Sequence, residues 1–432
     1  MTAKALPLRT PAAADPGPHP RPRRGFVPVL AVTVGSLNGV LLAAAVLTLS
    51  LAATAIDSAR ATTVLSVVVT AGGAAQLVCY PLIGKLSDRT TGRLGRRRPY
   101  LIAGAVVMAA GGALEVAAAS TAVLALAYVT LSVGAVSALV ACNAIVPDQL
   151  PADRRGPASA AIGLGAPIGA VVGIFLAQLG QPDLGLMVLY PTALGVACAL
   201  FLAVFVTDRP TGLSDRPPLS PRAFLSTFVS TFWVNPLRHP AFGFAWISRF
   251  CIFFGVSCVN SYQAFYLIAV QHVDPATVGT SVLTASLVGT GTALVFSPLA
   301  GKLSDKVGRR KPFVIASAVL FAAGLVLTAL ATDFTGFLLA VAVTGLGQSV
   351  YFAVDFALIT EVLPDPDDTA KDLGIMNLAM SLPSSVVPAI APTLLAVGAT
   401  AAVPQNFTVL FGTGAAAAVI GALAVVPLRG VR

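Results

Sequence analysis

The sequence predicts an all-α integral membrane protein in which twelve transmembrane helices form two six-helix bundles, related as parallel repeats. Three observations carry this prediction. The 432 residues are 56% hydrophobic and 10% charged, with a mean hydropathy of +0.86, whereas soluble domains carry about 25% charged residues. The apolar residues fall in long uncharged runs. A charged motif recurs in the second part of the chain.

A segment needs about 20 apolar residues to cross a bilayer, and the first half of the chain supplies six such segments. Residues 1–25, rich in Pro and Arg, precede them and are expected to form a disordered cytoplasmic tail. The N-terminal bundle is expected over residues 26–207. Its apolar runs are Gly25–Ile56, Ala61–Gly84, Pro99–Pro147 (two spans that turn near Ser120), Gly156–Pro182 and Leu184–Thr207.

The second half is expected to supply six more spans. A polar, proline-rich cytoplasmic connector over residues 208–240 separates the halves, and residues 241–432 are expected to form the C-terminal bundle. Its last uncharged run is long enough for two spans hinged around Gly398–Pro404. The runs are Ala241–Val273, Pro275–Gly301, Pro312–Thr332, Phe334–Thr360 and Leu373–Leu428.

The distribution of the 27 Lys and Arg residues predicts the orientation. All of them except Arg60 and Arg249 fall in the tail, in the loops on one side of the predicted spans, or at the C-terminus. Cytoplasmic segments carry such an excess of basic residues, so both termini are expected on the cytoplasmic side of a multi-pass protein of the inner or plasma membrane. The formal charge of +9 therefore describes orientation in a lipid bilayer, and we expect no nucleic-acid partner.

Residues that carry most enzyme and metal chemistry are sparse. The five cysteines lie inside apolar runs without a CxxC pair, and the three histidines are scattered. Neither a disulfide framework nor a metal site is expected from this pattern. The predicted spans hold no His/Asp/Glu or Ser/Lys cluster, so we do not expect an enzyme.

The charged motif lies in Gly84–Tyr100, GKLSDRTTGRLGRRRPY, and recurs in Gly301–Phe313, GKLSDKVGRRKPF. The first copy has four extra residues before GRR, after which the two copies again agree closely. Glycine lets helices approach one another, a carboxylate near a helix end can meet an arginine, and basic residues hold a loop on anionic lipid. A repeat this close predicts two related halves.

Two interpretations of the motif remain open. It could only fix the topology, or it could form a cytoplasmic latch that closes and opens. We favour the latch because both copies keep the same spacing of acid and base. Its candidate residues are Gly84, Asp88, Arg89, Gly95, Arg96, Arg97, Arg98, Gly301, Asp305, Lys306, Gly308, Arg309, Arg310 and Lys311.

On these residues the chain resembles the major facilitator superfamily (MFS). The pattern GxLSDxxGRRK between the eighth and ninth spans, repeated between the second and third, is similar to the signature loop of that family. The resemblance covers the whole chain and implies the MFS fold, with the Asp, Arg and Lys residues of both copies holding the cytoplasmic side closed. The Thr90–Leu94 insertion departs from the usual spacing and is similar to glycoside–cation symporters and plant-type sucrose transporters.

A second repeat supports the duplication. Ile145–Pro151, IVPDQLP, is echoed by Leu358–Pro364, LITEVLP, and both precede a charged connector. The following Ala370–Ala379, AKDLGIMNLA, also resembles the sugar-symporter branch.

Ionisable residues within hydrocarbon are costly, so they are functional candidates. Arg249 in the seventh span and Asp355 in the tenth are expected to pair near the inner mouth, although each could instead extend to its nearer interface. Glu115, toward the outer end of the third span, could have a functional role or could extend to its nearer interface. Polar uncharged candidates could line a cavity and bind hydroxyl-rich ligands, or simply join neighbouring helices: Asn38, Gln76, Asn143, Asn260, Tyr262, Gln263, Gln348, Tyr351 and Asn377.

Together these features predict a secondary transporter that exposes a central cavity to each side of the membrane in turn. From the resemblance, proton-coupled uptake of a sugar or glycoside is the leading hypothesis. The alternatives are a proton-antiport exporter of amphipathic small molecules and a non-transporting sensor of the same fold. We expect a monomer with a small-molecule substrate and no cofactor, driven by a proton or other cation gradient.

Overall fold

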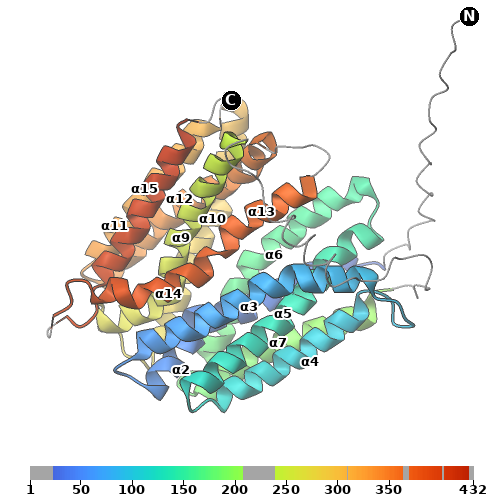
Figure 1. Cartoon of the computed structure of the whole chain (residues 1–432), viewed down its shortest axis with the longest axis horizontal. Coiled ribbons are helices and arrows are strands. Elements are labelled where there is room, and N and C mark those ends of the chain that lie inside the picture. The colour runs from blue at the N-terminus through green and yellow to red at the C-terminus, as the bar shows by residue number, and fades with distance from the viewer. Residues whose placement is uncertain (1–22, 208–238, 309, 363–368, 401–402, 428–432) are drawn as a thin grey trace, which may run out of the picture.

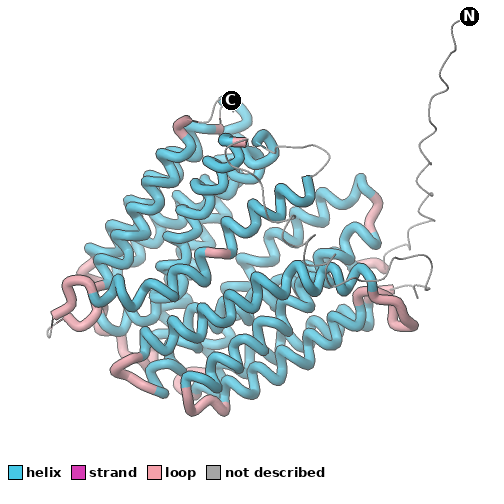
Figure 2. The backbone as a smooth tube through the Cα atoms, in the orientation of Figure 1, coloured by secondary structure: helices cyan, strands magenta, loops and turns pink. Residues whose placement is uncertain are grey.

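The computed structural model describes residues 23–207, 239–308, 310–362, 369–400 and 403–427, and these residues form helices joined by loops (Figures 1 and 2). Twelve helical segments in this part of the chain are long and apolar enough to cross a membrane, which confirms the predicted all-α membrane fold. Almost all of the tail and of the connector lies outside the described residues.

The first six spans are built from eight elements. The first span is interrupted by the π-helical segment η1, and Ser120 and Asp183 cap the fourth and sixth spans by accepting hydrogen bonds from Val123 N and Leu186 N. The bounds are α1 (Phe26–Ala43), η1 (Ala44–Thr48), α2 (Leu49–Ile56), α3 (Ala61–Arg89), α4 (Arg98–Val116), α5 (Thr121–Gln149), α6 (Ala152–Leu179) and α7 (Leu184–Phe205).

The last six spans are built from seven helices. The eleventh span is divided into two helices where Pro383, which cannot donate a backbone hydrogen bond, opens the second one. The bounds are α9 (Pro240–Ala269), α10 (Val278–Val307), α11 (Lys311–Leu330), α12 (Phe334–Val362), α13 (Thr369–Ser381), α14 (Pro383–Ala396) and α15 (Phe407–Val425).

Equivalent helices of the two sets make equivalent contacts. In the first set α4 packs on α5 and α7, and α3 packs on α5; in the second set α11 packs on α12 and α15, and α10 packs on α12. The same pairings in the same order are the structural counterpart of the repeated motif.

Glycines bring α1 and α6 together. A Cβ added at Gly35, Gly39, Gly165, Gly169 or Gly173 would fall within 3 Å of the backbone of the other helix. These small residues thus let the two helices pack backbone against backbone, as small residues do in lipid.

The repeated motif differs from the expected short loop. Helix α3 continues through Asp88 to Arg89, and α10 continues to Val307, so the GKLSD half of each copy is helical. The prediction that Gly84 and Gly301 permit close helix packing is wrong for the structure. A Cβ on Gly84 or Gly301 would make only ordinary contacts, at 3.9 and 4.0 Å.

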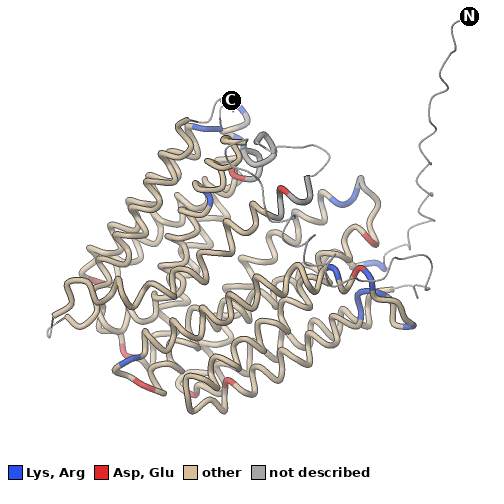
Figure 3. The backbone as a smooth tube through the Cα atoms, in the orientation of Figure 1, with Lys and Arg blue, Asp and Glu red and all other residues tan. Residues whose placement is uncertain are grey.

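The two sets of helices diverge from one end of the molecule toward the other. We call the end that holds the motif loops the charged end and the opposite one the far end; Figure 3 shows basic residues gathered at the charged end. At the far end, Ser66 on α3 is hydrogen-bonded to the Tyr262 hydroxyl at 3.0 Å, and Gln178 on α6 donates to Thr280 at 3.2 Å. Figure 1 shows the helices fanning apart from this contact, so the far end is closed.

Candidate functional site

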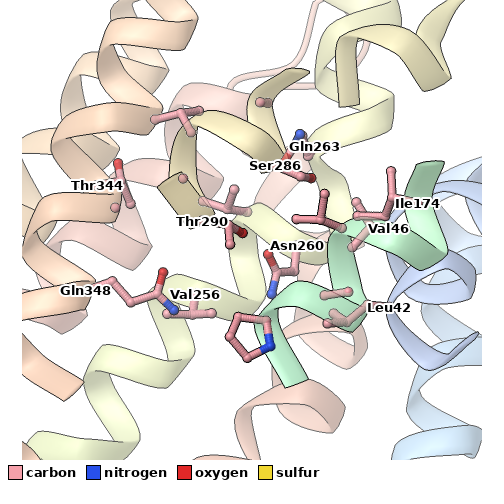
Figure 4. Close-up of a pocket in the computed structure, with 18 of the residues that line it drawn as sticks. Leu42, Val46, Ile174, Val256, Asn260, Gln263, Ser286, Thr290, Thr344 and Gln348 are labelled. Carbon is pink, nitrogen blue, oxygen red and sulfur yellow. The ribbon is translucent and has the colours of Figure 1, made fainter. Parts of the chain in front are cut away.

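A first cavity of about 230 Å³ lies between the two sets of helices (Figure 4). Its two walls differ in chemistry. Among the described residues, the first half of the chain contributes only apolar side chains to the lining, among them Leu42, Val46 and Ile174. Every amide and hydroxyl of the lining comes from the second half: Asn260, Gln263, Ser286, Thr290, Thr328, Thr344 and Gln348.

A second cavity of about 250 Å³ adjoins the first, with which it shares Leu42, Val256 and Asn260. Gln76 and Tyr128 add polar groups from the first half, and Phe253 and Met380 add apolar ones from the second. No Asp, Glu, Lys or Arg lines either cavity in the described part of the chain. Both spaces therefore suit an uncharged molecule.

Two polar groups of the cavity walls lack partners among the described residues. Gln263 is 6% exposed and its Nε2 makes no hydrogen bond, and the Ser257 Oγ is also buried without a partner. A buried donor without an acceptor is costly, so each is a ready hydrogen-bonding group for a bound molecule.

The structure separates the polar residues singled out in the sequence. Gln76, Asn260, Gln263 and Gln348 line the cavities. The other five do not: Tyr262 and Tyr351 are fully buried, Asn38 donates to the Val34 carbonyl, and Asn143 and Asn377 lie on exposed faces. The hydroxyls of Ser286, Thr290 and Thr344 were missed, because single Ser and Thr residues in apolar helices carry no distinguishing signal.

Arg249 and Asp355 lie together next to the second cavity. The Arg249 Nη1 is 3.3 Å from the Asp355 Oδ2, and both side chains are largely buried. Arg249 also lies over the Phe253 ring, 5.9 Å from its centre, and its Nη2 is 3.8 Å from the Met380 sulfur. Phe253 and Met380 line the second cavity, so the ion pair packs against two residues of its wall.

Glu115 is buried near the far end, with 2% of the residue exposed. Its Oε1 accepts a hydrogen bond of 2.7 Å from the Thr48 hydroxyl, the last residue of η1. Its Oε2 has no hydrogen-bond partner among the described residues. The structure thus places this carboxyl inside the bundle and not at an interface.

At the charged end, Arg97 joins three helices of the first half. Its side chain is 5% exposed, and it binds Asp88 of α3 at 2.8 Å and Asp148 of α5 at 2.7 Å, while its Nη1 donates to Ser87. Burial alone would lower the pKa of the Arg97 guanidinium, but the hydrogen bonds to Asp148 and Asp88 outweigh burial and raise this pKa. Asp148 belongs to the IVPDQLP repeat, yet its partner could not be read from the sequence.

The last basic residue of each motif copy makes the same contact. Arg98, at the start of α4, donates to the Val206 carbonyl at the end of α7, and Lys311, at the start of α11, donates to the Val426 carbonyl at the end of α15. A cation at a helix C-terminus is favourable because the free carbonyls there carry partial negative charge. Each copy of the motif thus binds the end of the last span in its own half to the start of the third span of that half.

The rest of the motif is only partly described. Arg96 lies 3.4 Å from Asp88, whereas Arg89 and Lys306 are exposed. Gly95 and Gly308 have positive φ, +81° and +65°, which glycine adopts without strain. The Asp305 side chain and Arg309 lie outside the described residues, so the expected latch of the second copy has no described geometry, and Arg310 and Lys311 are both half-buried.

These features define a class of protein: a twelve-span membrane transporter built from two repeated halves around an uncharged cavity. The chain belongs to the Major Facilitator Superfamily, whose model matches residues 26–292 and again 245–431. The predicted family is thereby confirmed.

Curated relatives match a limited segment. The chain is 37% identical over 108 residues to the multidrug resistance protein MdtL of Citrobacter koseri, and 34% identical over 108 residues to that of a Shewanella species. Each match covers 25% of this chain and 25% of the relative, so the chain spans about a quarter of the length of the curated relatives it matches.

Solved structures match nearly the whole chain. A nucleoside transporter, NupG, aligns with a TM-score of 0.72 at 14% identity, covering 93% of this chain and 99% of its own. A D-xylose–proton symporter aligns with a TM-score of 0.71 at 17% identity, covering 94% and 98%. At these identities the likeness shows the shared fold.

Proposed function

We propose that the chain is a secondary active transporter that exports an uncharged amphipathic small molecule by alternating access. The observation that carries the proposal is the two-faced first cavity, with its apolar wall from the first half and its polar wall from the second. A ligand with one apolar side and one hydrogen-bonding side would match both walls, and orientation by a few polar groups is typical of small-molecule sites. The relatives named multidrug resistance proteins support export.

Binding is the first test. We expect uncharged amphipathic compounds, such as steroids and coumarins, to raise the thermal unfolding midpoint of the purified protein, and disaccharides to leave it unchanged. Asn260→Ala should reduce this shift because Asn260 lines both cavities. Asn377→Ala is the matched control, since Asn377 also lies in the second half but lines neither cavity. No shift with any amphipathic compound would reject the proposal.

A second candidate is proton-coupled uptake of a sugar or glycoside. The amides of Asn260, Gln263 and Gln348 favour it, because amides pair well with hydroxyls, as does the Thr90–Leu94 insertion. Accumulation of a labelled disaccharide in proteoliposomes under an inward proton gradient would establish this candidate and overturn export. Ligand binding without any flux would instead point to a sensor.

A further inference from the structure

We propose that Glu115 is the proton-binding site of the transporter, and that its protonated form holds the far end closed through Thr48 and η1. This inference deepens the proposed function by naming the coupling ion and its site, and it rests on that function for the coupling step alone. The proton site itself rests on the burial of Glu115 and, among the described residues, on its single hydrogen bond and the absence of a counter-charge.

The helices around Glu115 offer no positive charge that would stabilise its carboxylate form. Residues 26–56, which form α1, η1 and α2, contain no titratable side chain. On α4 itself the only cation is Arg98, at the charged end. On α5 the titratable side chain nearest this end is Tyr128; α7 offers only Tyr190 and Cys198, and the exposed Asp183 precedes it.

A buried carboxylate without a cation and with one hydrogen bond is strongly disfavoured. Binding one proton converts it to a neutral carboxylic acid. The proton then resides on Oε2, the oxygen without a partner, while the Thr48 hydroxyl continues to donate to Oε1. In this closed conformation the neutral acid is the form that the site accommodates.

The π-helical segment connects this site to the cavities. Thr48 contacts Glu115, whereas Val46 and Ala45, only two and three residues earlier, line the first and second cavities. Such π-helical segments are rare and often occur at functional sites. Loss of the proton would require water or a new donor at Oε2, and the far end must open to admit either. Opening of that end and release of the proton are therefore coupled through η1.

Infrared difference spectroscopy tests the site without any ligand. We expect the wild type and Asp183→Asn at neutral pH to show the carbonyl band of a protonated carboxylic acid, and Glu115→Gln to lack it. Asp183 is a suitable control because it is an exposed acid at the same end, and asparagine can keep its cap on Leu186 N. Identical spectra for wild type and Glu115→Gln would overturn the proposal. If Glu115→Gln does not fold, Thr48→Val should shift the band to higher frequency, and an unshifted band would overturn it.

Proteoliposomes test the coupling. The pH indicator pyranine is enclosed in the proteoliposomes, and the amphipathic compound that gave the largest shift of the thermal unfolding midpoint is added. We expect this compound to cause a proton flux with the wild type and with Asp183→Asn, and none with Glu115→Gln. Glu115→Gln should still bind that compound, because Glu115 lines neither cavity. Proton flux retained by Glu115→Gln would reject the coupling role. A wild type that shows the carboxylic acid band but no flux with any compound would refute the proposed function and leave the proton site intact.

Discussion

At the charged end, Arg97 links helices α3 and α5 of the first half. Because it bridges Asp88 and Asp148 while itself being buried, Arg97→Ala should lower the free energy of unfolding by about 1.5–3 kcal/mol, the range for hydrogen bonds to charged groups. The measurement is the thermal unfolding midpoint in detergent. Arg96→Ala is the control: its one longer contact to the exposed Asp88 is expected to contribute less than about 1 kcal/mol.

The ion pair behind the second cavity predicts non-additive mutational effects. Arg249→Ala leaves Asp355 buried without its cation, so adding Asp355→Ala should restore part of the lost stability. Contacting pairs show interaction energies of about 0.5–3 kcal/mol. The two single variants and the double variant should be compared by thermal unfolding and by flux, and strictly additive losses would contradict a stabilising pair.

Residues differ in how far the sequence predicts their partners. Arg249 and Asp355 stood out because charges are rare in apolar spans, and each needs a partner. Thr48 did not stand out, since threonine is common in helices and no residue pattern marks a π-helical segment. Asp148 was visible as part of a repeat, but its bond to Arg97 depends on how α4 and α5 pack. Tertiary geometry, absent from a single sequence, decides such pairs.

At the scale of elements, the contact of α1 with α6 depends on glycine. Gly169→Ala would place a methyl group against the Gly35 backbone, and overpacking of this kind costs about 1–3 kcal/mol. We expect a lower thermal unfolding midpoint and less monodisperse protein. Gly163→Ala on the same helix is the matched control, because a Cβ there has nothing within 4 Å; equal effects of the two changes would show that the close approach is unimportant.

The helices themselves were largely predictable, because the length of an apolar run is set by the membrane. Their ends were less so. Helices α3 and α10 continue past their apolar runs through the Lys, Leu, Ser and Asp residues of GKLSD. The helical backbone hydrogen bonds do not depend on an apolar side chain, so a polar residue does not by itself end the helix. The divisions at η1 and before Pro383 required the structure.

For the whole molecule, the closed far end predicts a conformational trap. In a variant without the five natural cysteines, Gln178→Cys combined with Gly279→Cys should form a disulfide on oxidation, because a Cβ at Gly279 would lie 3.3 Å from the Gln178 Cγ, the position that a cysteine sulfur would take. The bond would prevent opening of the far end and abolish flux, and a reductant should restore it. Each single cysteine variant is the control. Full flux in the oxidised double variant would show that transport does not need this end to open.

The repeated motif predicted an architecture of two related halves. It did not predict the conformation, that is, which end of the molecule is closed. Nothing in GKLSD or GRRRP reveals which end is closed, because the same chain must adopt both states during transport. The cavity walls were equally hidden: Asn260 and Asn377 lie on neighbouring spans with the same amide, and only packing brings the first to the cavity.

The far-end contact is made by hydroxyls, amides and backbone carbonyls: Ser66 with Tyr262, Gln178 with Thr280, and Gln181 with the Pro275 carbonyl. Parting these groups separates no formal charges. Ionic strength should therefore act weakly on these contacts and strongly on the basic charged end, where salt screens exposed charges. The far end should thus respond mainly to hydration, and the charged end to ionic strength and to the charge of the lipids.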